Sequence, residues 1–244
     1  MIVAVAVCPN EAVLLGETFR LTKVFARTLP LAPMSYVHLV SADPLVVDVD
    51  DSNHGALRVF DRTGRQTRVV SAHRHGATLD LSPRPEANVR EFADRNREFP
   101  FVVSGQTLVA PTARPQDGAG KPDTLMGVDL GSGADVWSRT LPWHMGFMLG
   151  ASPDPATTVY GFYEGGDTTR DLDPRTPVDA PPQTFTADPR TGAVHKGAAL
   201  DPGTSALDLG NTGYQQVFVA ERTTILVGVG HLDDDAPLVA AYGT

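Results

Sequence analysis

A four-residue string that occurs twice constrains the fold of this chain more than any other feature. Arg27-Thr28-Leu29-Pro30 recurs as Arg139-Thr140-Leu141-Pro142. The two copies begin 112 positions apart (27 to 139), too far for one repeat but right for two repeats of about 56 residues. A short β unit cannot bury its apolar face alone, so it must stack on copies of itself. The sequence therefore predicts an array of similar β units along the whole chain.

A second recurring signal is an apolar run that ends in an Asp, followed three or four positions later by a Gly. The pairs are Asp61 and Gly64, Asp129 and Gly133, and Asp188 and Gly192. An Asp at the end of a strand can accept hydrogen bonds from the amides of a turn, and a Gly can adopt the positive φ that closes the turn. We therefore expect these residues to hold turns, and we assign them no chemistry.

The composition suits many turns and few helices. The 244 residues include 23 Gly and 20 Pro, and 41% of them are apolar, so global disorder is not expected. Cys8 is the single cysteine, which excludes an intramolecular disulfide and a thiolate metal cluster. Residues 2–7 are apolar but lack a basic region before them, so we expect a strand there and no signal peptide. These features favour a cytoplasmic location, with an extracytoplasmic one left open for a longer protein.

Short runs rich in Val, Ile, Tyr, Phe and Thr predict the strands of each unit. The units of this single domain span about 1–35, 36–82, 99–146, 147–205 and 206–244. In each unit two strands, b and c, form a hairpin. The Asp/Gly turn then leads to an outer strand d, and a crossing segment after strand d supplies the innermost strand a of the next unit. The predicted b and c strands are 2–7 and 12–15, 44–50 and 56–60, 106–112 and 124–130, 157–163 and 184–187, and 224–230 and 238–242.

Residues 127–137 resemble the repeat of the pyrroloquinoline-quinone-like (PQQ-like) β-propellers. That family has Asp-x-x-(Thr/Ser)-Gly at the turn between strands c and d, and an aromatic residue, usually Trp, four positions after the Gly. Trp137 fits this pattern, whereas Arg68 and Lys196 stand where the other units would have the Trp. The resemblance implies an all-β fold, a propeller-like array of about four to five four-stranded blades. It also implies that Trp137 covers the seam between two blades.

The predicted array is incomplete. The first unit starts inside strand b and the fifth stops in strand c, so strand a of the first and strand d of the fifth have no evident sequence. Five complete units of about 56 residues would require roughly 280 residues. We therefore expect either a segment of a longer propeller or a ring that a partner closes by strand exchange.

Cofactor and metal sites are not strongly indicated. Quinone-dependent members of the PQQ-like family hold their cofactor with a Trp and a disulfide between adjacent cysteines, so PQQ is not expected here and no cofactor is predicted. Asp48, Asp50 and Ser52 have the alternate spacing of a calcium loop, but Val59 stands where a bidentate Glu is required. We interpret these three residues as a solvated hairpin tip and a weak metal candidate.

Three histidines and one stretch with helical spacing are the remaining candidate features of the sequence. The spacing of His73 and His75 would place both rings on one face of a strand, without a third zinc ligand. His144 precedes a strand expected near the central axis, which makes it a candidate for a residue of a central pocket. Residues 86–99 have helical spacing and predict a short surface helix between units. No catalytic residue is assigned.

The net charge of −9 argues against a nucleic acid partner and permits a cationic one. The b–c loops carry −2 at 50–55, zero at 113–123, −3 at 164–182 and −3 at 230–238, together −8. The sequence thus predicts a noncatalytic binding or scaffold module with an acidic loop face for a protein partner. An alternative is a propeller hydrolase or lyase with a His/carboxylate or metal site in its central funnel. The acidic residues proposed for the partner face are Asp50, Asp51, Asp171, Asp173, Asp233, Asp234 and Asp235.

Overall fold

The regular structure of the chain consists of β-strands. The computed structural model describes residues 2–8, 11–20, 22–31, 36–50, 56–81, 101–112, 124–141, 145–151, 159–163, 183–199, 215–221, 224–229 and 239–243. Within these ranges there is no helix, and the strands form five antiparallel sheets and one small hairpin. The predicted all-β fold is therefore confirmed, while the predicted helix at 86–99 lies outside the described residues.

The first two sheets occupy the N-terminal third of the chain. The first contains β1 (Ile2–Cys8), β2 (Glu11–Glu17) and β3 (Lys23–Pro30). The second contains β4 (Tyr36–Ala42), β5 (Leu45–Asp50), β6 (Ala56–Phe60) and β7 (Gln66–Ser71). A two-stranded hairpin, β8 (His73–Arg74) and β9 (Ala77–Thr78), follows the second sheet.

The remaining three sheets follow in chain order. The third contains β10 (Val102–Ser104), β11 (Thr107–Pro111), β12 (Thr124–Asp129) and β13 (Asp135–Thr140). The fourth contains β14 (Met145–Ala151), β15 (Val159–Tyr163), β16 (Gln183–Ala187) and β17 (Val194–Ala199). The fifth contains β18 (Gln215–Glu221), β19 (Thr224–Val229) and β20 (Val239–Gly243).

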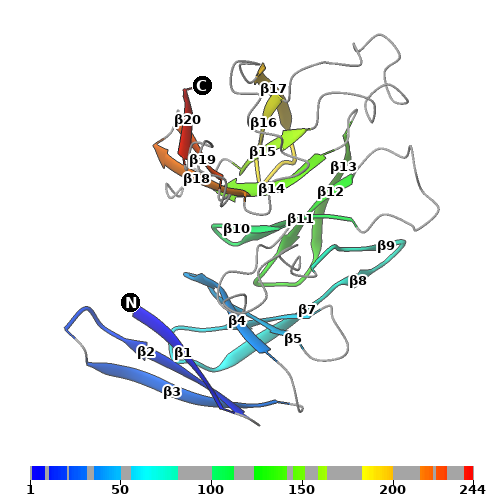
Figure 1. Cartoon of the computed structure of the whole chain (residues 1–244). Coiled ribbons are helices and arrows are strands. Elements are labelled where there is room, and N and C mark those ends of the chain that lie inside the picture. Colours follow the sequence, from blue (N-terminus) through cyan, green and yellow to red (C-terminus); the bar gives the residue numbers. More distant parts are fainter. Residues whose placement is uncertain are drawn as a thin grey trace.

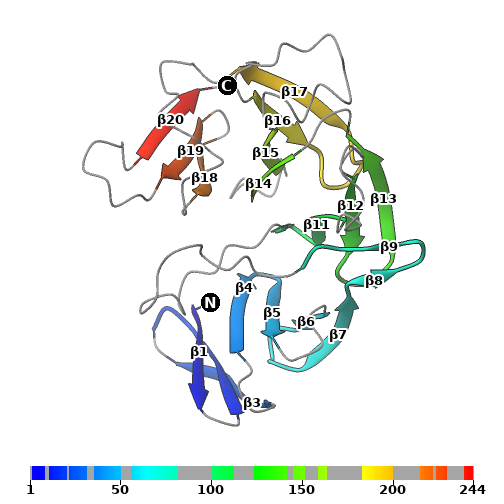
Figure 2. The ribbon, with the colours of Figure 1, turned by 45° about the vertical axis from the view of Figure 1, so that its right-hand side comes forward.

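The five sheets stand side by side in an open arc, with the N-terminal and C-terminal sheets at its two ends (Figures 1 and 2). Each sheet is an antiparallel meander whose spatial order equals its chain order. The first strands of successive sheets, β4, β10, β14 and β18, neighbour one another on the inner side of the arc. Radial stacking of four-stranded meanders around an inner row of strands is the architecture of a β-propeller.

Among the residues whose burial the structure describes, three apolar clusters join the sheets at seams. Because side chains alternate along a strand, each middle strand sends one set toward the preceding sheet and the other toward the following one. In β5, for example, Val47 packs in the seam with the first sheet, while Val46 packs in the seam with the third; both side chains are fully buried. The third seam, between the third and fourth sheets, contains Trp137 and Phe185. Stacking of sheets thus supplies the burial that a single sheet lacks.

The two ends of the strands define two faces of the arc. The a–b and c–d turns lie at one end, which we call the turn face; there the amide of Leu130 donates to the carbonyl of Gln106 over 2.8 Å. The b–c connections leave from the opposite end, which we call the loop face. In the second sheet, for instance, Leu45 pairs with Phe60 near the turn face, and Asp48 pairs with Leu57 nearer the loop face.

The two end sheets have three strands each among the described residues. By its contacts with the second sheet, β3 corresponds to the outer strand d, so β1 and β2 correspond to strands b and c. In the fifth sheet β18 lies on the inner side, beside β14, so this sheet contains strands a, b and c. By register, the described part of the first sheet contains no strand a and that of the fifth contains no strand d, although β1 lies beside β4 as the inner strands of the other sheets lie beside one another.

Candidate binding face and blade seams

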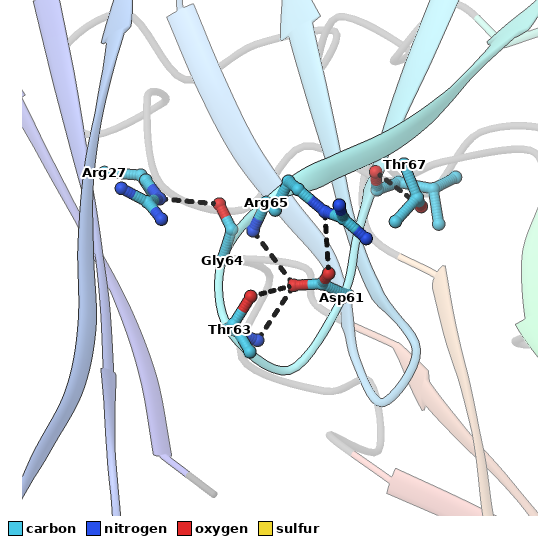
Figure 3. Close-up of polar contacts among 7 residues, drawn as sticks. Arg27, Asp61, Thr63, Gly64, Arg65 and Thr67 are labelled. Atoms are coloured by element: carbon cyan, nitrogen blue, oxygen red, sulfur yellow. Dashed lines mark hydrogen bonds and ion pairs between the residues drawn. The ribbon is translucent and has the colours of Figure 1, made fainter.

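The turn between β6 and β7 shows how the Asp of the repeat works (Figure 3). One carboxylate oxygen of Asp61 accepts hydrogen bonds from the Thr63 hydroxyl at 2.6 Å and from the amides of Thr63 and Arg65 at 2.9 and 3.0 Å. The other oxygen accepts one from the Arg65 guanidinium at 3.3 Å. These donors, the Thr63 hydroxyl foremost, lower the pKa of Asp61 to about 2. The carboxylate is therefore committed to the turn.

The corresponding turns of the third and fourth sheets use the same device. Asp129 accepts from the Ser132 amide and hydroxyl, both at 2.6 Å, and the hydroxyl is the main cause of the lowered pKa of Asp129. Asp188 accepts from the amides of Arg190 and Thr191 at 2.7 and 3.2 Å. The closing residues Gly64, Gly133 and Gly192 have φ of 75°, 75° and 68°. The three aspartates thus act as acceptors inside the turns.

The first sheet uses a different residue at the same place. The register pairs Gly16 with Phe25, as it pairs Gly127 with Trp137, so Thr18 takes the position of Asp129. The Thr18 hydroxyl accepts from the amides of Arg20 and Thr22, both at 3.2 Å. The first unit has no Asp-to-Gly pair at this place, although a Thr that follows a strand is itself a signal for a hydrogen-bonded turn.

An aromatic side chain fills the first and third seams. Trp137 packs between Gly127 of its own sheet and Gly192 of the next, and its indole Nε1 donates to the Pro189 carbonyl at 2.6 Å. Phe25 is placed equivalently, between Gly16 and Gly64. A Cβ at any of these glycines would overlap the ring, so glycine is what admits the aromatic side chain.

In the middle seam, between the second and third sheets, arginines take the place of the aromatic side chain. Arg27 and Arg139 follow Phe25 and Trp137 by two residues, and each donates from Nε to the turn carbonyl of the next sheet, Gly64 at 3.1 Å and Gly192 at 3.3 Å. In the second sheet Arg68 stands at the aromatic position and packs over Gly133. The residue two further on is the buried Val70, so the second sheet has no counterpart of Arg27 and Arg139 on its own outer strand.

The β8–β9 hairpin supplies an arginine, Arg74, at this seam. Its guanidinium donates to the Gly133 carbonyl at 2.6 Å and pairs with the carboxylate of Asp135. The prediction that His73 and His75 share a strand face is wrong, because the chain turns at His75 and Gly76. Both imidazoles are exposed, and the hairpin latches the second sheet to the third.

The weak metal candidate also looks different in the structure. Asp48 is only 5% exposed, so it does not belong to a solvated hairpin tip. It lies within β5, where it pairs in register with His38 of the inner strand β4. Asp50 is the last residue of β5, and Ser52 lies outside the described residues. In the part of the chain that the structure describes, no three His, Cys, Asp or Glu side chains gather as a metal site.

A depression of about 300 Å³ opens on the turn face between the second and third sheets. Its walls include Asp61, Leu130 and the exposed pair of Asp43 and Arg62, whose charged atoms are 3.4 Å apart. The Asp61 carboxylate already accepts hydrogen bonds from Thr63 and Arg65 of its own turn. The depression is therefore bounded mainly by groups that maintain the fold.

The loop face is where the acidic segments leave the sheets. The flanking strand ends are Asp50 and Ala56 in the second sheet, Pro111 and Thr124 in the third, Tyr163 and Gln183 in the fourth, and Val229 and Val239 in the fifth. Of the predicted partner-face residues, Asp50 closes β5. Asp51, Asp171, Asp173, Asp233, Asp234 and Asp235 lie outside the described residues, as does His144.

The stacked meanders and their repeated seams define the chain as a β-propeller array. Solved structures with a similar fold include the N-terminal domain of Nup159 (12% identity, TM-score 0.45) and the Dos1 propeller (9%, 0.41). They also include an S. cerevisiae assembly of Dbp5 bound to Nup159 and Gle1 (13%, 0.44). The matches cover 96%, 89% and 96% of this chain but 51%, 47% and 50% of theirs, so the chain spans about half their length.

No protein-family model and no curated protein matches the chain. Among the described residues, no helix is long and apolar enough to span a membrane.

Proposed function

We propose that this chain is a noncatalytic propeller module that binds a basic protein partner through the loop face. The observation that carries the proposal is topological. Every b–c connection leaves a sheet at the end opposite the Asp/Gly turns, so segments distant in the sequence emerge on a common side. Those segments contribute −8 of the chain's −9. A one-sided negative field of this kind attracts and orients a cationic surface and repels nucleic acid.

The chemistry of the turn face also supports a binding role. The carboxylates of Asp61, Asp129 and Asp188 accept hydrogen bonds from their own turns, and the arginines of the seams donate to turn carbonyls. These groups maintain a rigid frame on which the loops are displayed. We further propose that the repeat is of the PQQ-like type, based on the Asp-to-Gly turns and the position of Trp137. No quinone site accompanies that proposal, because the chain has one cysteine.

The test is the binding of poly-L-lysine to two variants of equal charge. Asp233→Asn with Asp235→Asn removes two charges from a b–c loop, whereas Glu17→Gln with Asp43→Asn removes two from the turn face. At roughly 0.5 kcal/mol per exposed pair, the loop variant should bind about fivefold more weakly, and high salt should reduce the difference. The turn-face variant should stay within about twofold of the native chain.

Equal losses in both variants would mean that net charge alone governs binding, and the proposal would then fail. Poly-L-glutamate serves as the control for nonspecific adhesion, since it should bind neither variant. Tighter binding of duplex DNA than of poly-L-lysine would also contradict the acidic-face interpretation.

A further inference from the structure

The first sheet exposes an apolar surface on the side that faces away from the second sheet. Along β1, Val3 and Val5 pack against the seam core, while Ile2, Ala4 and Ala6 point the other way and are exposed. The register places Ala4 opposite Leu15 and Ala6 opposite Val13, which are half-buried on β2. These five residues form a continuous apolar patch, which we call the outer face.

The register shows what the outer face corresponds to in the other sheets. Ile2 pairs with Glu17, the residue just before the c–d turn, as Leu45 pairs with Phe60, Leu108 with Val128 and Val159 with Ala187. Ile2 is 41% exposed, whereas Leu45, Leu108 and Val159 are 2%, 0% and 0% exposed. The same position is thus buried by a preceding sheet in three cases and open in the first.

The backbone of the first sheet is open at the same place. In the second, third and fourth sheets, strand b pairs on its inner side with strand a: β5 with β4, β11 with β10, and β15 with β14. Among the described residues β1 pairs with β2 alone, and no described strand pairs with its other edge. Both an apolar face and a hydrogen-bonding edge are therefore presented together.

We propose that the outer face is a docking surface for a further propeller blade that is carried by a partner chain. The three seams described above are the template, since each buries this same surface under the preceding sheet. A second copy of this chain is not the occupant we infer. Its five sheets would bring a closed ring to about ten blades, beyond the four to eight that propellers typically contain.

The seams also specify the chemistry of the incoming blade. It would present an apolar face made by strands b and c, and an arginine of strand d that donates to a turn carbonyl, as Arg27 and Arg139 do. The receiving turn is the one that Thr18 holds. The position of Glu17 is occupied in the next three sheets by the buried residues Phe60, Val128 and Ala187. An incoming blade would bury the Glu17 carboxylate, so it should also place a cationic or hydrogen-bond donor group there.

A blade taken from the chain itself provides the probe. Residues 99–158 carry the third sheet, β14 and the connection that follows it; joined directly before Ile2, they put Ile2 in the sequence position of Val159. The full chain with this extension should protect the β1 amides from hydrogen exchange by at least about tenfold, because β14 would supply the missing inner strand. Ile2→Glu with Leu15→Glu in the extended chain should abolish this protection.

The proposal would be overturned if the β1 amides exchanged as fast in the extended chain as in the unextended one while the amides of the added sheet were protected. The unextended chain gives an independent test that does not require the added sheet to fold. Its outer face should bind the apolar dye ANS, and Ile2→Glu with Leu15→Glu should remove that signal while Val69→Glu, at an exposed valine elsewhere, should not. If the native chain is folded but binds no dye, the inference is refuted. It is also refuted if the native chain forms a stable dimer and the double variant is a monomer, because the occupant of the outer face would then be a second copy.

Discussion

Truncation of Trp137 tests whether the seams hold the array together. The indole is 9% exposed, and an aromatic side chain of this size buries about 200 Å², worth roughly 5 kcal/mol at 25 cal/mol per Å². Its Nε1 also donates to the Pro189 carbonyl at 2.6 Å, a bond worth about 1 kcal/mol. Because the glycines on both sides cannot fill the space, Trp137→Ala should cost about 4–5 kcal/mol. Trp137→Phe, which keeps most of the contact but loses the donor, should cost about 1–2 kcal/mol.

The assay is equilibrium urea denaturation combined with hydrogen exchange resolved by peptide. In a stacked array each sheet is stabilised by its neighbours, so the loss should be concentrated in the third and fourth sheets and should separate their unfolding from that of the first. Val136→Ala is the matched control: Val136 is adjacent and 48% exposed, and its truncation should cost less than about 0.5 kcal/mol. A cost for Trp137→Ala below about 1 kcal/mol, or protection lost equally in all sheets, would refute the seam argument.

Three further predictions concern the turns and the hairpin. Gly192→Ala should destabilise the protein by about 2 kcal/mol more than Gly76→Ala, as measured by thermal unfolding of the two variants. Both glycines have positive φ, but a Cβ at Gly192 would lie 2.6 Å from the Trp137 ring, whereas one at Gly76 would meet nothing within 4 Å. The pKa of Asp61 is lowered to about 2, so its contribution to stability is complete above about pH 4 and is lost as the pH falls toward 2; Asp61→Asn should flatten the stability curve in that window, and carboxyl NMR titration should give the pKa directly. A double-mutant cycle on Arg74→Ala and Asp135→Ala should give a coupling of about 1 kcal/mol, and a coupling near zero would mean that the pair does not help to latch the hairpin.

The local elements of this fold could be predicted because they depend on short-range physics. Alternating apolar runs predicted hairpins such as 44–50 and 56–60, which the structure has as Leu45–Asp50 and Ala56–Phe60. The Asp-to-Gly spacing predicted turns at residues such as Asp129, where the amides that bind the carboxylate lie within a few positions along the chain. Such contacts need no information from a distant segment.

The errors occurred where a residue's environment depends on another segment. His73 and His75 were expected on one strand, but the chain reverses at His75 and Gly76, and the hairpin is anchored by contacts with the third sheet such as Arg74 with Asp135. Asp48 was interpreted as part of a solvated tip, yet neighbouring strands bury it. Local spacing cannot report which strand will pack beside a residue.

The sequence by itself determined that this chain is an array of β meanders, because the repeat period, the turn residues and the apolar alternation can all be read from the order of the residues without knowledge of which segments pack together. Tertiary structure alone decided how the repeats complete one another. It placed Arg74 at a seam whose own strand carries the buried Val70, and it left Ile2 exposed where Leu45 and Leu108 are buried. The physical reason is that burial and hydrogen-bond satisfaction belong to pairs of surfaces, and a pair exists only once distant segments have been brought together.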